Sequence, residues 1–538
     1  MPTGLLFTKT LASPAFRNKF TMMPNRAADI LFQLIKSLEK AEKRHFKLYI
    51  KRSSGKEDLK IVRLFDALDK LKEYDEKALL KKLTGVTKPQ LANLKSHLYK
   101  QIMASLRLLK SADSLDLQLN EQFDYAHILY KKGLFLQSLR IIERAKETAK
   151  ANQKFNFLPQ LIALEKRIEN LHITRSMQDR AESLSSEANE VSRHIDTVAR
   201  LSNLALKLYS WYVEHGHARN EEDEKDIRQF MKENLTKDVW EQTGFYERLY
   251  LYQSYTWYAF IRQDFLQYYR YTKKWVDLFA EQPLMVRVET GHYIKGLHNL
   301  LNAHFDLRNY RMFERTLKQL ERLAQTDRVK EHDSFRIQAF IYISTAKINQ
   351  HFMQGTFKQG VALIPGIKEK LEGYHLFIDS HRILVLNYKF AMLYFGSGDH
   401  KRAIDYLQLI INDKTNLRYD LQCYARLVHL MAHYELGNDM LMESLTKSVY
   451  RFMAKMKNLT VVEEAMFRFL RNSLPLSPRQ LKPEFEKLLH TIKHLEKNRF
   501  ETRSFAYLDI ISWIEGKVYG KPMGTIIHEK YLQSKRKK

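Results

Sequence analysis

The sequence is short of cysteine, glycine, proline and long apolar runs. Its one cysteine, Cys423, cannot form an internal disulfide and predicts a reducing compartment, which we take to be the cytoplasm. Its 18 glycines and 11 prolines are few for 538 residues, whereas all-β folds need many such turn residues. No uncharged apolar run reaches the roughly 18 residues that cross a bilayer. These shortages predict an all-α protein without a membrane span.

Residues that favour helices are abundant. Leu, Lys, Glu, Ala, Arg and Gln dominate the composition, and 44% of the residues are apolar, which is enough for a large core. The formal net charge of +27 fits attraction to acidic proteins, nucleic acid or anionic lipid. The lysines are spread widely rather than held in one block, so solvated helix surfaces explain the charge as well.

A turn between two helices recurs along the chain, and its clearest copy is at Gly355. An apolar stripe at helical spacing ends at Phe352, and glycine readily enters the left-handed conformation that stops a helix. A second helix is expected from Phe357, with the small Gly360 where two paired helices cross most closely. This pattern resembles the middle of a tetratricopeptide repeat.

The copies of this turn are evenly spaced. The turn positions are Gly133, Gln263, Arg308, Gly355, Gly398 and Gly437. The last five lie 45, 47, 43 and 39 residues apart, further than the roughly 34 residues of a tetratricopeptide repeat. The sequence therefore predicts an α-solenoid of antiparallel helical hairpins with long, degenerate tetratricopeptide-like repeats. Further turns are expected near residue 171 and at Gly216, and a long, partly exposed helix over Ile173–Ala199.

The chain divides into five predicted parts. Residues 1–28 are expected to be a disordered tail, or an extension upstream of a true start at Met22 or Met23. Residues 29–112 form a basic helical module with 20 basic and 9 acidic residues between Lys36 and Lys110. Residues 113–473 hold the repeats, 474–530 are C-terminal capping helices that begin at Ser477 and Pro478, and 531–538 are a basic tail with a disordered end.

Two segments resemble parts of uncharacterised bacterial tetratricopeptide-repeat-like proteins. They are Lys40–Tyr49, with the sequence KAEKRHFKLY, and Phe505–Glu515, with the sequence FAYLDIISWIE. The resemblance implies a cytoplasmic bacterial helical-repeat protein. It implies no established activity and no catalytic residue.

Thirteen aromatic residues between positions 245 and 275 suggest a partner surface. Tyr252, Tyr255 and Tyr271 fall off the apolar stripes of their predicted helices. Together with Arg248 and Arg262 they are candidates to line a concave peptide groove, since Tyr and Arg often anchor interfaces. The alternative is that these tyrosines pack in the core.

The basic N-terminal module has a candidate nucleic-acid surface at helical spacing. Its cations are Arg44, Lys47, Lys51 and Arg52. Cations at this spacing beside Phe46 and Tyr49 can contact phosphates while an aromatic ring stacks on a base. The alternative is that the aromatics belong to the core and the cations to its solvated edge.

A second basic segment, Ala78–Leu91, is similar to a helix-turn-helix. In that arrangement Lys88, Asn93, Lys95 and His97 would face DNA. A plain helical turn explains the same pattern.

No motif in the sequence establishes a reaction, a cofactor or a metal site. His429 and His433 share a helix face, but Leu430 replaces the glutamate of His-Glu-x-x-His. The segment Gly396–Asp399 is too short for a phosphate loop and is explained by the repeat turn. The sequence therefore predicts a non-enzymatic scaffold that binds another protein, presumed acidic, as a peptide or helix on a concave repeat surface. The alternative is a nucleic-acid-associated or regulatory protein that uses the basic module.

Overall fold

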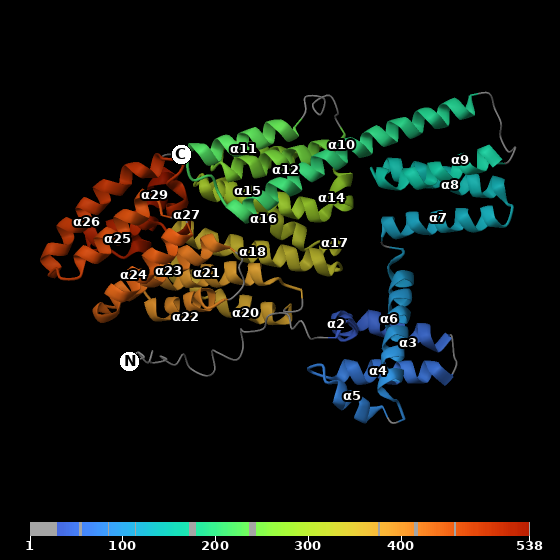
Figure 1. The fold of residues 1–538 in the computed structure, drawn as a ribbon, viewed down its shortest axis with the longest axis horizontal. Helices are drawn as coiled ribbons and strands as arrows, with labels where there is room; N and C mark the ends of the chain where they lie inside the picture. The colour runs from blue at the N-terminus through green and yellow to red at the C-terminus, as the bar shows by residue number, and fades with distance from the viewer. Residues whose placement is uncertain are drawn as a thin grey trace, which may run out of the picture. The chain divides into compact units, whose positions relative to one another are not determined.

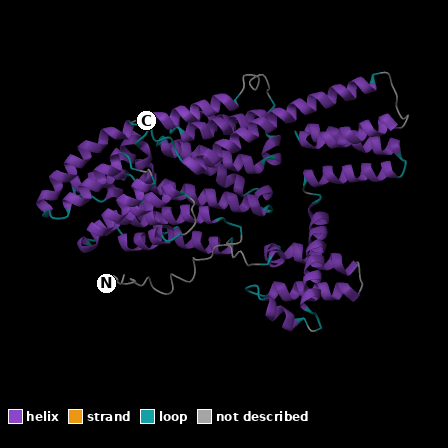
Figure 2. Ribbon diagram, viewed as in Figure 1, coloured by secondary structure: helices purple, strands orange, loops and turns teal. Residues whose placement is uncertain are grey.

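The computed structural model describes most of the chain. The described residues are 29–52, 56–83, 85–112, 114–171, 179–235, 244–374, 377–413, 418–456 and 459–536. They form helices and loops without a strand, as Figure 2 shows, so the all-α prediction is confirmed for them. No helix in these ranges is both long and apolar enough to cross a membrane. The expected tail or alternative start in residues 1–28 lies outside the described residues.

The chain falls into two compact units that meet in sequence between Ile195 and Asp196. In the first unit the helices are α2 (Ile30–Ser37), α3 (Lys40–Arg52), α4 (Lys56–Lys70), α5 (Glu76–Lys82), α6 (Lys88–Lys110), α7 (Leu115–Lys131), α8 (Phe135–Ala151), η1 (Phe155–Phe157) and α9 (Leu158–Leu171). Helix α10 (Arg180–His215) begins in this unit and ends in the other. A long helix was expected over Ile173–Ala199, and α10 agrees with that expectation from Arg180 to Ala199.

The second unit holds the remaining helices (Figure 1). They are α11 (Glu221–Asn234), α12 (Phe245–Ile261), α13 (Phe265–Glu281), α14 (Leu284–Val288), α15 (Thr290–Asp306), α16 (Tyr310–Ala324), α17 (Asp327–Lys330), α18 (Asp333–Gln354), α19 (Phe357–Val361), α20 (Ile364–Gly373), α21 (Ser380–Ser397), α22 (His400–Ile411), α23 (Tyr419–Glu435), α24 (Asp439–Lys455), α25 (Val461–Ser473), α26 (Pro478–Lys493), η3 (His494–Lys497), α27 (Thr502–Tyr507), α28 (Ile510–Tyr519) and α29 (Met523–Arg536).

Helices α2–α6 share a core of their own. Phe46 of α3 and Phe65 of α4 lie at its centre with their ring centroids 4.8 Å apart. The ends of these helices follow their sequence signals: Asp75 accepts hydrogen bonds at the start of α5, and Thr87 and Gln90 form a capping box on α6. A second core joins α7, α8, α9 and the first half of α10 around Leu161.

The predicted turn positions are confirmed by the backbone. The positive φ angles are 76° at Gly133, 55° at Gln263, 51° at Arg308, 70° at Gly355, 88° at Gly398 and 67° at Gly437. In each case the next residue donates its N–H to the carbonyl five residues back, which is the bond of a Schellman cap. The following helix begins two residues after the turn residue. Gly216 also has a positive φ, and the turn expected near residue 171 falls where the described residues stop.

Helices that are close in sequence pack on one another through the second unit. Helix α12 packs on α13, α13 on α15, α15 on α16 and α18, α21 on α22, α22 on α23, and α23 on α24. The largest core of the protein runs from Ile337 to Ile527. Helix α23 is buried almost all round between Leu421 and Ala432, so it has neighbours on every face.

The C-terminal helices pack both on their sequence neighbours and on much earlier helices. Helix α26 begins at Pro478 with the expected Ser477 cap and packs on α25 and α28. Helix α29, however, packs on α18 and α21, which precede it by more than 120 residues in the sequence. The carbonyl of Gly355 lies close enough to Gly524 that a Cβ there would be 2.9 Å from it. The basic tail predicted from residue 531 remains helical as far as Arg536.

Between η3 and α28 the chain crosses several helices of the same unit, and we call residues Arg499–Tyr507 the crossing segment. Thr502 donates to Gln263 Oε1 at 3.1 Å, and the ring of Tyr507 stacks on Tyr424 at 4.1 Å. The crossing segment therefore contacts both the turn after α12 and helix α23, whose residues Gln263 and Tyr424 lie 161 positions apart in the sequence.

Candidate functional site

The structure brings the three candidate tyrosines together. The rings of Tyr255 and Tyr271 stack with centroids 4.3 Å apart and planes 9° apart. The Lys274 ammonium lies 5.3 Å from the centroid of Tyr271 and 5.9 Å from that of Tyr252. All three tyrosines are partly buried, and burial raises the pKa of Tyr255 to about 12. Tyr255 also packs against the small cluster of the buried Leu201 and Leu251, so part of its surface belongs to the core.

The two candidate arginines are each held by a carboxylate. Arg248 lies one turn before Tyr252 on α12, and its Nη1 is 2.8 Å from Glu281 Oε2. Arg262 is turned to α11, where its Nη2 is 2.7 Å from Glu224 Oε1. The sequence places Arg262 beside the tyrosines, whereas the structure places its guanidinium in a different cluster.

That cluster consists of three arginines around one buried carboxylate, and we call it the arginine cluster. Glu224 Oε1 accepts from Arg228 Nη2 at 2.8 Å and from Arg262 Nε at 2.9 Å. Arg499 of the crossing segment approaches with its Nη1 3.1 Å from Oε1, and its Nη2 contacts Oε2. Burial by itself raises the pKa of Glu224, but the hydrogen bonds from Arg228 and Arg262 outweigh burial and lower that pKa from 4.5.

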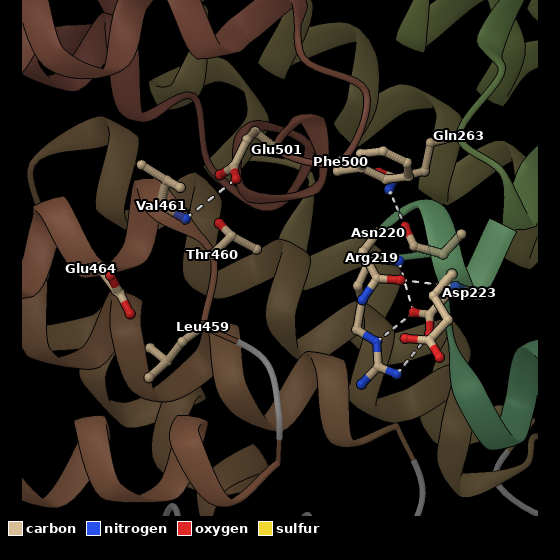
Figure 3. Close-up of a pocket in the computed structure, with 12 residues that line it drawn as sticks. Arg219, Asn220, Asp223, Gln263, Leu459, Thr460, Val461, Glu464, Phe500 and Glu501 are labelled. Carbon is tan, nitrogen blue, oxygen red and sulfur yellow. Dashed lines mark hydrogen bonds and ion pairs between the residues drawn. The ribbon is translucent and has the colours of Figure 1, made fainter.

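A cavity of about 580 Å³ lies where the crossing segment meets α11 and α25. Figure 3 shows Arg219 and Asp223 facing each other on one side and Glu501 reaching Val461 on the other. Arg219 Nε is 2.8 Å from Asp223 Oδ2, and the Glu501 carboxylate accepts the N–H groups of Val461 and Val462 at 3.3 and 3.2 Å. Arg219, Asp223 and Glu501 are therefore already engaged within the protein.

The N-terminal module turns its aromatic side chain inward. Phe46 is 1% exposed and belongs to the core, so it does not stack on a base, whereas Tyr49, the other candidate ring, is half-buried against the same core. Lys47 Nζ is 2.7 Å from Asp66 Oδ1. Arg44, Lys51 and Arg52 are exposed, and they take part in none of the ion pairs found among the described residues of the module.

The segment similar to a helix-turn-helix also turns one of its candidate residues inward. Lys95 is paired with Asp29 and donates to the hydroxyl of Tyr74 at 2.8 Å. His97 is hydrogen bonded to Gln101 at 3.0 Å, while Lys88 and Asn93 are exposed. Lys95 is therefore committed to its own module rather than presented to DNA.

A polar line runs along one face of α15. Its members follow at steps of three and four residues, which keeps them on one side of a helix. They are His292, Lys295, His298, Asn302 and Asp306. The other faces of α15 pack on α13, α16 and α18, and the residues of the line are only partly buried.

Three other helices meet this line with polar and aromatic side chains, and we call the whole set the polar band. Trp257 of α12 lies under Lys295, with Nζ 5.9 Å from the ring centroid. Tyr342 of α18 stacks on His298 at 3.8 Å, and Lys389 of α21 donates to Asn349 Oδ1 at 2.6 Å. Arg382, two turns before Lys389 on α21, completes the band.

Cations exceed carboxylates in the polar band. Burial and the charge of Arg382 lower the pKa of Lys295, and burial lowers that of Lys389 to about 8 against the opposing charge of Asp306. Burial, helped by the charges of Lys389, Lys295 and Arg382, lowers the pKa of His298 to about 3. The charges of Lys295, Lys389 and Arg382 therefore all act on His298, while Asp306 is the carboxylate of the line itself and Asp379 lies 3.3 Å from Arg382.

Sequence reasoning missed the polar band because its members lie on four separate helices. The sequence did contain a hint, because two pairs of band residues are spaced seven positions apart. A spacing of seven is two helical turns, so the two residues of each pair lie on one face of their helix. The pair on α18 is Tyr342 and Asn349, and the pair on α21 is Arg382 and Lys389.

The histidine pair on α23 lacks a third ligand. The rings of His429 and His433 are 4.6 Å apart, and His433 Nδ1 is 2.8 Å from Asn438 Nδ2. Glu435 is engaged by Trp513 Nε1 and Lys517 Nζ, each at 2.6 Å. Over the described ranges, no group of three or more potential ligands is placed to hold a metal ion.

The comparisons with known proteins do not place the chain in a family. No protein-family model matches it and no curated protein matches it, so a functional conclusion has to come from the geometry of the polar band and the arginine cluster.

Proposed function

We propose that this chain is a non-enzymatic scaffold that binds an acidic peptide or helix of another protein along the polar band. The observation that carries the proposal is Lys295. It is partly buried, its ammonium lies 5.9 Å from the centroid of the Trp257 ring, and none of the ion pairs among the described residues of its unit involves it. Partial burial of an ammonium without a carboxylate is unfavourable, and an acidic side chain of a partner relieves that cost.

The arrangement behind this function is a tetratricopeptide-like α-solenoid of antiparallel hairpins, as in the bacterial proteins that two segments resemble. Every helix that contributes to the polar band comes directly before one of the recurring turns: α12, α15, α18 and α21 end one or two residues before the turn residues at 263, 308, 355 and 398. First helices that share one surface are what a solenoid presents to a bound peptide. A location in the cytoplasm, where acidic proteins are plentiful, is part of the same proposal.

The chemistry of the polar band suits recognition of a peptide. Trp257 and Tyr342 supply flat apolar area, the amides of Asn302 and Asn349 supply polar contacts, and Lys295 attracts carboxylates. The three tyrosines around Lys274 form a second candidate surface, on α12 and α13. We assign no catalytic role to any of these groups.

A pull-down with the full chain tests the scaffold. We expect protein partners to stay bound after nuclease treatment and Lys295→Glu to lower their retention about tenfold, the effect of losing one charge pair and gaining a repulsion. Lys401→Glu is the matched control, because Lys401 is exposed on α22 and the change in net charge is the same. Partners that vanish with nuclease, or that bind the two variants equally, contradict the proposal.

Binding of nucleic acid by the basic module is a second candidate function. It is favoured by Arg44, Lys51 and Arg52, which are exposed on one helix in a region rich in basic residues. The expected result is that changing these three residues to glutamine abolishes retention of nucleic acid by the full chain. Retention that is unchanged in this triple variant removes the candidate.

A further inference from the structure

The arginine cluster holds more hydrogen-bond donors than its carboxylate can use. Glu224 accepts five hydrogen bonds from Arg228, Arg262 and Arg499, whereas a carboxylate offers about four lone-pair positions. Each guanidinium carries five N–H donors, and the three bring a charge of +3 to a single negative charge. The cluster therefore has donors and positive charge for a second anion.

A hollow of about 310 Å³ adjoins the arginine cluster. Its lining residues are Glu221, Glu224, Lys225, Arg228 and Arg499. The side chains of Arg228 and Arg499 are 66% and 34% exposed, so solvent reaches both guanidiniums, while Glu224 is 5% exposed. Lys225, exposed on the same helix as Arg228, adds another cation to this lining.

We propose that the hollow is a binding site for a phosphate group, held between Lys225, Arg228 and Arg499. Guanidiniums bind phosphate oxygens through paired N–H groups, and a lysine adds a point charge. The volume of the hollow is larger than that of one phosphate ion, so the hollow also admits the group that carries the phosphate. The ligand is therefore either free phosphate or the phosphate of a small molecule such as a nucleoside monophosphate.

A bound phosphate would connect two parts of the fold. Lys225 and Arg228 belong to α11, whereas Arg499 belongs to the crossing segment, which reaches Glu224 through this one arginine. The phosphate thus adds a second link between α11 and the crossing segment. This site is formed by residues other than those of the polar band, so it stands or falls independently of the scaffold function.

Calorimetric titration of the full chain tests the site, with inorganic phosphate in one arm and adenosine monophosphate in the other. Chloride keeps the ionic strength constant. We expect the wild-type chain to bind phosphate, and Arg228→Gln and Lys225→Gln each to weaken binding about tenfold, the loss for one charge-assisted hydrogen bond. Arg287→Gln is the control, because Arg287 is an exposed arginine outside the lining of the hollow. Tighter binding of the nucleotide identifies a carried phosphate, and equal binding identifies the free ion.

A second variant shifts affinity in the opposite direction. Glu224→Gln removes the competing negative charge, so it should bind phosphate more tightly than the wild type, and phosphate should raise its Tm more. A merely structural role for the cluster predicts no such gain. The proposal is wrong if the wild-type chain binds neither phosphate nor adenosine monophosphate, or if Arg228→Gln binds them as tightly as the wild type does.

Discussion

Gly355→Ala is expected to destabilise the protein by about 3 kcal/mol, from a left-handed backbone and a backbone collision together. Gly355 has a φ of +70°, where a Cβ is strained. A Cβ there would also collide with the carbonyl oxygen of Gly524 and lie 2.8 Å from the backbone nitrogen of His528. Backbone atoms cannot rotate away as a side chain does, so α29 has to move off the turn.

Gly398→Ala provides the matched control for this prediction. Gly398 occupies the equivalent turn with a φ of +88°, but a Cβ there would meet nothing within 4 Å. Its substitution should therefore cost only the conformational part, about 1 kcal/mol. Chemical denaturation of the two variants measures the difference. Equal losses of stability would mean that the contact between Gly355 and α29 adds nothing.

The position of α29 has a dynamic consequence that hydrogen exchange can follow. In Gly355→Ala the amides of α29 should exchange faster, while those of α12 and α13 should keep their rates. The reason is that α29 packs on α18 and α21 next to this turn, whereas α12 and α13 pack on each other elsewhere.

Glu224→Gln is expected to destabilise the protein by about 2 kcal/mol. Removing one partner of a buried ion pair costs about 3–5 kcal/mol, and partial exposure of Arg228 and Arg499 reduces that cost. Three guanidiniums then surround a neutral amide. Glu221→Gln, an exposed glutamate in the first turn of the same helix, should change stability by less than about 0.5 kcal/mol. A loss as small as this in Glu224→Gln would mean that the cluster adds no stability.

The same carboxylate predicts how stability depends on pH. The pKa of Glu224 is lowered in the folded protein, so the unfolded chain takes up its proton first as the pH falls. The stabilisation is therefore fully present above pH 4.5 and is lost as the pH falls through the folded pKa. Denaturation of the wild type between pH 6 and pH 3 should show this loss, and Glu224→Gln should show a smaller one.

Local features of the fold were predicted from the sequence because their causes are local. A helix stops where a residue can adopt a positive φ, and the even spacing located such residues even at Gln263 and Arg308, which are not glycines. The start of α26 at Pro478 follows from a serine cap and a proline in the first turn. Phe46 is buried in the core of the basic module, as the alternative interpretation of its aromatic residues predicts.

Contacts between distant parts of the chain could not be predicted from local sequence patterns. Arg499 lies 275 positions from Glu224, and Tyr507 lies 89 positions from Arg418, whose Nη2 is 3.1 Å from its hydroxyl. Helical periodicity says which residues share a face but not which face meets another. For this reason Arg262 was expected beside the tyrosines and instead contacts Glu224.

The sequence by itself determined that this protein is all-α and where its helices turn, because backbone propensity and side-chain periodicity act over a few residues. Only the tertiary structure decided that α29 returns to Gly355, and that Lys295 shares a polar band with Lys389. The same is true of the three arginines on one carboxylate. These depend on which helix faces are left over after the core is buried, and that choice is made by the packing of the whole unit.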